Sequence, residues 1–217
     1  ALFQASDGRI WIGTQMQGAA VLDPASGQLT HFQSESNRTS HPWVSGFAEP
    51  IPGRIWVHTY GGGIDVVDAA SNLIVERIRS DLSVPGGLTL DRLTAPIQDR
   101  SGLVWIGTWG AGVQRHNPNN AAAFRTIRHS AALSNGLSTG SVMSTLPIDA
   151  DRVWIGTGGN GIDILDLTAG VVDGHRPHPT RPGALRDGTI RALVRGPDDS
   201  IWVGTQQAGL QRFLPAT

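Results

Sequence analysis

Apolar residues in this chain come in short runs, and each run is bounded by glycine, proline, aspartate or serine. Residues 10–12 and 104–106 are two such runs. Short apolar runs between turn residues predict β-strands, and no helical spacing of apolar positions competes with them. Strands that are buried on both faces show continuous apolar runs instead of strict alternation. The pattern therefore predicts an all-β protein whose inner strands are covered on both sides.

One unit recurs five times along the chain. Each copy has a tryptophan, a threonine three residues later and a glycine seven residues later, and successive tryptophans stand 45 to 49 residues apart. The tryptophans are Trp11, Trp56, Trp105, Trp154 and Trp202, and the glycines are Gly18, Gly63, Gly112, Gly161 and Gly209. Five matches at fixed offsets indicate a structural repeat.

The repeat extends to both sides of this frame. An apolar residue stands twelve positions before the tryptophan in four copies (Val44, Leu93, Val142 and Ile190), and a further β-rich run follows in four copies. Each copy thus offers four strands, which we call a to d. Four strands with a period of about 40–50 residues are typical of a β-propeller blade. The expected blades are residues 1–38, 39–87, 88–136, 137–185 and 186–217.

The first and last blades are expected to be incomplete. The chain begins ten residues before Trp11, within strand a, and it stops after strand c of the last copy. We therefore expect four blades and a partial fifth, as a piece of a larger propeller such as a seven-bladed one. Such a piece would be an open arc or would be completed by another chain. Its exposed end blades are expected to favour self-association or a homodimer of the receptor.

The residues of the frame have expected structural roles. The five tryptophans should be buried in equivalent places on strand b. The glycine ends the turn between strands b and c, where a positive φ is cheap only for glycine, and the threonine can bond local backbone groups. Asp65 and Asp163 in strand c align with Gln114 and Gln211. This repetition predicts hydrogen bonds from blade to blade.

The segments at Trp11, Trp105 and Trp154 contain W-I-G-T, and residues 22–24 read L-D-P. In these residues, and in the connectors at 133–138 and 182–185, the chain resembles the two-component regulator propeller repeat. The second copy departs from it, with Val57 and His58 in place of Ile and Gly. The resemblance implies an extracytoplasmic, periplasmic sensing module of a bacterial receptor. The output half would be a histidine kinase, hybrid regulator or diguanylate cyclase, and some members of this family recognise glycans.

Composition narrows the chemistry. The net charge is −1, all 17 basic residues are Arg, and there is no Cys. The charge gives no attraction to nucleic acid, and the missing thiols exclude disulfides and thiolate sites. The seven His show no metal-ligand spacing. We expect no metal, cofactor or catalytic residue, and a membrane partner only through segments outside this chain.

Candidate binding residues lie where the b–c turns and the d–a connectors should share one face. Amides and aromatic rings in these turns suit a glycan or another small polar ligand, although exposed turns are often simply polar. Trp109 could contact such a ligand or cover a neighbouring blade. His58 could be a ligand contact, a proton carrier or a structural residue. The full set is Gln15, His58, Tyr60, Trp109, Asn160, Arg191 and Gln206.

These observations favour a sensing and ligand-binding propeller that is not itself an enzyme. Two other readings stay open. One is a propeller enzyme of the lyase or glycan-hydrolase type, although no pair of carboxylates presents itself for glycan cleavage. The other is a scaffold through which a receptor dimerises.

Overall fold

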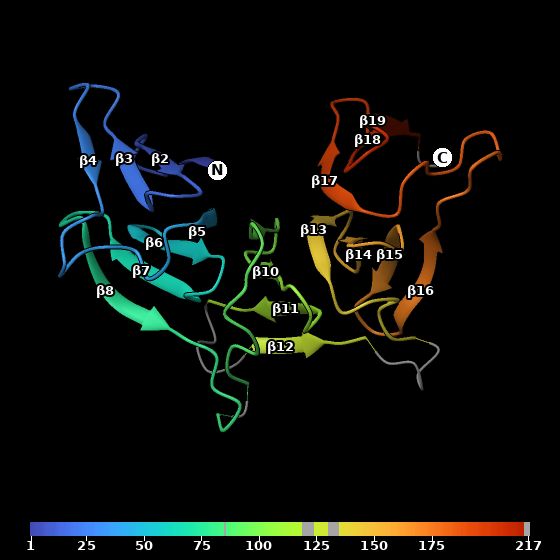
Figure 1. The fold of residues 1–217 in the computed structure, drawn as a ribbon, viewed down its shortest axis with the longest axis horizontal. Coiled ribbons are helices and arrows are strands. Elements are labelled where there is room, and N and C mark those ends of the chain that lie inside the picture. Colours follow the sequence, from blue (N-terminus) through green and yellow to red (C-terminus); the bar gives the residue numbers. More distant parts are fainter. Residues whose placement is uncertain (85, 119–123, 130–134, 215–217) are drawn as a thin grey trace. The chain divides into compact units, whose positions relative to one another are not determined.

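The computed structural model describes residues 1–84, 86–118, 124–129 and 135–214, and within them the chain is all-β (Figure 1). The connector resemblance at 133–138 lies partly outside these residues. No helix in the described ranges is long and apolar enough to cross a membrane.

The strands form five antiparallel sheets in which consecutive strands are neighbours. The first four sheets have four strands each, and the last has three among the described residues. The expected all-β class with propeller blades is confirmed. The first sheet is β1 (Leu2–Gln4), β2 (Ile10–Gly13), β3 (Ala19–Leu22) and β4 (Leu29–His31). The second sheet is β5 (Val44–Ile51), β6 (Arg54–Thr59), β7 (Ile64–Asp68) and β8 (Leu73–Ile78).

The remaining three sheets follow in chain order. The third is β9 (Ile97–Gln98), β10 (Val104–Gly107), β11 (Val113–His116) and β12 (Phe124–Ile127). The fourth is β13 (Val142–Pro147), β14 (Arg152–Thr157), β15 (Ile162–Asp166) and β16 (Gly170–His175). The last is β17 (Ile190–Arg195), β18 (Ile201–Thr205) and β19 (Leu210–Phe213).

The chain divides into two compact units. The first comprises residues 1–106 and 114–126, and the second comprises 107–113 and 127–217. In the first unit, Trp11 packs against Phe32 and Phe47, with ring centroids 5.4 and 6.0 Å away. In the second, Trp154 packs against His175 and Phe213, at 4.9 and 6.2 Å. Each tryptophan is thus covered by a side chain from the following blade, Phe47 for Trp11 and Phe213 for Trp154.

This packing explains an exception among the repeat tryptophans. Trp11, Trp56, Trp105 and Trp154 are buried, but Trp202 on β18 is 37% exposed. The expectation of a buried tryptophan in every copy is therefore wrong at Trp202. The last sheet has no following blade among the described residues that could cover its tryptophan.

The spacing of threonine and glycine has a local cause. All five repeat glycines have φ between 63° and 85°. In every copy the threonine hydroxyl donates to the glycine carbonyl, and it accepts the N–H of the residue that precedes the glycine. The side chain thereby closes the b–c turn from inside. The four-residue offset is what this pair of hydrogen bonds requires.

A second repeated contact ties strand c to the connector that enters the same blade. The side chain two positions after the repeat glycine accepts the N–H of a residue 25 positions earlier. The pairs are Asp65 with Ser40, Gln114 with Thr89, Asp163 with Ser138 and Gln211 with Arg186. By the expected blade bounds these four bonds stay within one blade. The expected bonds from blade to blade also occur, because Gln114 donates to the carbonyl of Gly87 and Gln211 donates to that of Ala184, each in the preceding blade.

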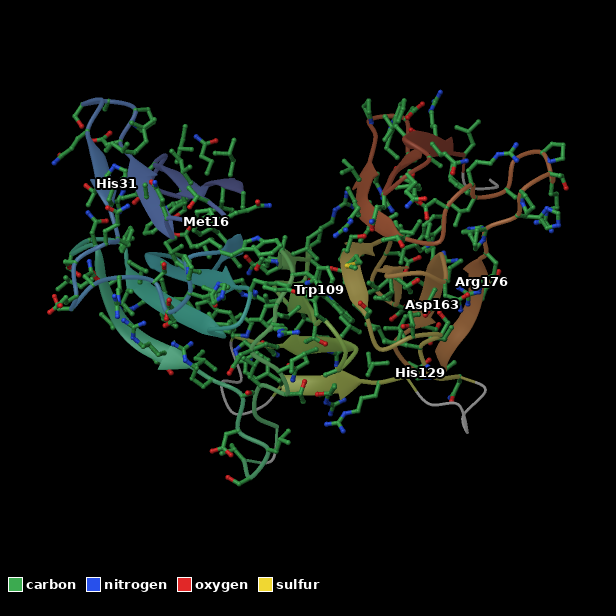
Figure 2. The ribbon with its side chains drawn as sticks, in the orientation of Figure 1. Met16, His31, Trp109, His129, Asp163 and Arg176 are labelled. Carbon is green, nitrogen blue, oxygen red and sulfur yellow. The ribbon has the colours of Figure 1, made fainter. Side chains whose placement is uncertain are left out.

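The charged members of this set have arginine partners. Arg176 pairs with Asp163 at 2.7 Å, and the two side chains lie next to each other in Figure 2. Arg77 pairs with Asp65 at 3.1 Å. Gln114 instead contacts Thr126, which stands at the same offset as Arg77 from Asp65. An uncharged side chain needs no counter-ion when it is buried.

Candidate functional site

The b–c turns and the d–a connectors meet, as the strand order requires. Isolated β-bridges join Tyr60 to Arg92 in the first unit, and join Trp109 to Ser141 and Gly158 to Thr189 in the second. In each bridge a residue just after strand b contacts the segment that enters the next blade. This edge of the blades, which we call the b–c rim, therefore has side chains from two sources.

Three of the candidate residues come together on the rim of the second unit. The guanidinium of Arg191 lies 5.9 Å from the ring centroid of Trp109, and its Nη2 donates to Oε1 of Gln206 at 2.9 Å. Trp109 follows β10, Arg191 lies in β17 and Gln206 follows β18. The indole is half-buried, whereas Arg191 and Gln206 are exposed. We call this group the Trp109 cluster, and Figure 2 labels its tryptophan.

Arg191 reaches the rim because of a bulge. The pairing of β17 with β18 shifts between Ile190 and Ala192, so Arg191 is the extra residue of its strand. Such a bulge re-aims the side chain that it carries. The copy between those of Trp109 and Arg191 has Gly158 at the turn position that corresponds to Trp109. Gly158 has no side chain that could occupy the rim between them.

An aspartate supports the same rim. Asp187 accepts the N–H groups of Thr189 and Gln207 at 2.9 and 2.7 Å, which orders the turn that carries Gln206. These two donors, that of Thr189 first, hold the pKa of Asp187 below its usual value. Asp187 was not among the sequence candidates. Its signal was its place in the connector before β17, the same kind of segment that the sequence assigned to this face.

The first unit has an aromatic group of its own. Tyr60 stacks on Trp43 with centroids 4.3 Å apart, His41 approaches the edge of its ring, and Arg92 lies 5.7 Å from its centroid. Of these four residues, sequence reasoning found only Tyr60. The others lie in connectors, where nothing in their spacing distinguishes them from ordinary turn residues.

The remaining candidates do not join a cluster. Gln15 and Asn160 are exposed in their own b–c turns. The backbone N–H of Asn160 donates to Thr157, and its carbonyl accepts a bond from Arg176. Ligand contact by Gln15 and Asn160 therefore remains a prediction from the sequence.

Comparisons with known proteins fit this architecture. A family model described as "Two component regulator propeller" covers residues 1–16, which include the first W-I-G-T. The resemblance to this propeller repeat is confirmed. No curated protein matches the sequence.

Solved structures share the fold across nearly the whole chain. The extracellular domain of BT3049 from B. thetaiotaomicron, described as a hybrid two component system, has a TM-score of 0.75 and 20% identity over 98% of this chain and 26% of its own. That of BT4673 from the same organism, described as a one component system, has 0.70 and 19% over 97% and 27%. PorZ of Porphyromonas gingivalis, a surface component of the type-IX secretion system, has 0.69 and 18% over 98% and 31%.

These likenesses establish the fold. The chain spans about a quarter to a third of the length of these three proteins. The shared fold is built on the repeated tryptophan, threonine and glycine positions. The residues of the Trp109 cluster do not belong to these repeated positions.

His58 is where the chain departs from the propeller repeat, and the structure buries it near the end of β6. In the other copies this position is a glycine, and strand a of the next blade packs against it at Gly13 and Gly156. A Cβ on Gly156 would lie 2.9 Å from a methyl carbon of Ile190. After His58, strand a of the next blade is only β9, two residues long.

The His58 side chain is fully buried, and neither of its nitrogens has a hydrogen-bond partner among the described residues. Burial lowers its pKa to about 3. A direct contact with a ligand at the surface is contradicted by this burial. A neutral, enclosed histidine also takes up no second proton near neutral pH.

No group of three or more His, Asp or Glu that could hold a metal ion occurs in the part of the chain that the structure describes.

Proposed function

We propose that this chain is part of an extracytoplasmic sensing propeller of a bacterial signalling receptor, and that the Trp109 cluster binds its ligand. The carrying observation is the convergence of an indole, a guanidinium and an amide from two different blades on one rim. Fold similarity to extracellular domains of bacterial signalling proteins supports the setting. The output half is of the histidine kinase, hybrid regulator or diguanylate cyclase type.

The ligand is a small polar molecule such as a glycan. An aromatic ring stacks on the apolar face of a sugar, while guanidinium and amide groups bond hydroxyls. Binding sites of this kind combine a ring surface with a few convergent polar groups. The exposed Arg191 and Gln206 supply those groups beside the half-buried ring of Trp109.

Binding fits the rim better than catalysis. A glycan hydrolase needs one carboxyl group whose pKa is raised, so that it can act as a general acid. Asp187, the carboxylate that orders the Gln206 turn, is shifted the opposite way by its two backbone donors. It is therefore suited to hold the turn and not to donate a proton.

The test is a thermal-shift screen of oligosaccharides on the 217-residue chain, followed by calorimetric titration of any ligand found. Trp109→Ala and Arg191→Ala should weaken binding by about tenfold or more, because each removes a contact that is worth roughly 1–2 kcal/mol. Arg212→Ala is the matched control. Arg212 lies 5.8 Å from the ring of Trp202, a pair of the same geometry on strands of the last sheet.

Three results would contradict the proposal. One is that no saccharide binds, and another is that binding survives both rim substitutions. The third is turnover of a saccharide that depends on a rim residue, which would favour the enzyme reading. Ligand-independent dimerisation without binding would favour the scaffold.

A further inference from the structure

A groove of about 620 Å³ lies in the first unit, at the end of β6 opposite to the b–c rim. Ile51 ends β5 and Arg54 begins β6, whereas Tyr60 follows the other end of β6. Val75 and Glu76 of β8 form a second wall. A volume of this size suits a small organic molecule.

The floor of the groove is aromatic. Trp56, His116 and Phe124 all line it. The ring centroids of Trp56 and His116 are 5.0 Å apart, and those of His116 and Phe124 are 4.7 Å apart. The walls add aliphatic surface, since the side chains of Ile51 and Val75 are about half exposed. A flat apolar ring would find contacts both below and beside it.

One polar group of the floor has no bonding partner. His116 is only 7% exposed, and its Nδ1 has no hydrogen-bond partner among the described residues. Burial lowers the pKa of His116, so the ring is neutral at neutral pH. A neutral imidazole has one donor and one acceptor nitrogen, and a half-turn of the ring exchanges its nitrogens with carbons at little steric cost. A hydroxyl can donate or accept, so it satisfies either arrangement.

The charges around the groove favour a neutral ligand. Arg54 is already paired with Asp68, at 3.0 Å. Glu76 is exposed, and its charge would repel a carboxylate. The remaining lining named above is uncharged.

We propose that this groove binds a small neutral aromatic alcohol, with its ring on Trp56 and Phe124 and its hydroxyl bonded to His116. This site is separate from the Trp109 cluster and lies in the other unit. Its failure would leave the proposed function untouched, and the reverse also holds.

The test compares phenol with toluene, which has a ring of similar size and no hydroxyl. Each is titrated into the 217-residue chain and followed by NMR chemical shifts of the tryptophan indole N–H groups. His116→Phe keeps an aromatic ring but removes the nitrogen. It should weaken phenol binding about tenfold, the effect of losing one hydrogen bond, and leave toluene binding within about twofold.

Two further variants define the site. Val75→Trp, at an exposed strand position, should fill the groove and abolish the binding of both compounds. His175→Phe is the matched control, because His175 packs on Trp154 in the second unit as His116 packs on Trp56. It should change neither affinity.

Each of the following results would overturn the proposal. One is that phenol at 10 mM, about tenfold above a roughly millimolar dissociation constant, fails to shift the Trp56 signal. Another is that binding survives Val75→Trp. The third is that the binding of phenol and of toluene weakens equally in His116→Phe, which would show that the imidazole nitrogens have no part in recognition.

Discussion

The guanidinium of Arg176 lies 2.7 Å from the carboxylate of Asp163, and that carboxylate has no exposed surface. Asp163 also accepts the N–H and the hydroxyl of Ser138, at 2.8 and 3.0 Å. One buried side chain thus joins strand c, the end of strand d and the connector into the blade. Arg176 therefore neutralises the negative charge of a carboxylate that has no access to water.

Removal of Arg176 should therefore leave a buried charge with too few partners. Arg176→Ala should lower the free energy of unfolding by about 3 kcal/mol, the low end for breaking such a pair, because Arg176 itself is partly exposed. The same substitution in an Asp163→Gln background should cost under about 1 kcal/mol, since Gln114 shows that an amide serves this position. Urea denaturation of the four proteins measures the difference. Equal costs in the two backgrounds would contradict this account.

An exposed pair provides the control. Arg152 and Asp149 are also 2.7 Å apart, but both are exposed. Arg152→Ala should change stability by no more than about 1 kcal/mol.

Stability should depend on pH through His58. Its pKa in the folded protein is about 3, whereas in the unfolded chain it has the ordinary histidine value of 6.5. Between these values the unfolded state binds the additional proton, so stability falls as pH is lowered from 6.5 towards 3, by up to about 1.4 kcal/mol per unit. His58→Leu should make this slope shallower. Burial lowers the pKa values of His116 and His175 too, so a residual slope remains.

The measurement is the free energy of unfolding at a series of pH values between 4 and 7 for both proteins. An identical slope for wild type and His58→Leu would show that His58 is not buried as described.

The two repeat tryptophans of the second unit, Trp154 and Trp202, should differ in what they contribute to stability. Trp154 is buried between His175 and Phe213, so Trp154→Ala should cost about 3–5 kcal/mol. Trp202 is 37% exposed, and Trp202→Ala should cost under about 2 kcal/mol because less apolar area is lost. Comparison of the two denaturation midpoints decides the point. A larger loss at Trp202 would mean that something covers its face.

Two of the repeat glycines allow the cost of backbone strain to be compared with the cost of steric overlap by an added Cβ atom. Gly161 and Gly209 both have positive φ, 82° and 72°. A Cβ on Gly161 would overlap the carbonyl oxygen of His175, whereas no heavy atom lies within 4 Å of that place at Gly209. Gly209→Ala should cost about 1 kcal/mol for the backbone alone. Gly161→Ala should cost at least about 2 kcal/mol more, by the same unfolding assay; equal costs would contradict the difference in packing.

The repeat itself could be predicted from the sequence, because its causes are local. Trp105, Thr108 and Gly112 stand at offsets set by one strand and one turn, and the threonine hydroxyl closes that turn within five residues. Strand alternation, turn chemistry and the positive φ of glycine act over the same short range. The number of blades and their strands follow from counting such units.

The exposure of Trp202, the burial of His58 and the meeting of Trp109 with Arg191 were decided only by the tertiary structure. Trp202 has the same local sequence frame as Trp154, and only the covering by a further blade distinguishes them. His58 is fully buried although it replaces a glycine of the repeat, and Arg191 reaches Trp109 because a bulge turns it to the rim. These outcomes depend on contacts between residues that are far apart in the chain. Burial is set by those distant residues, so local sequence propensity does not determine it.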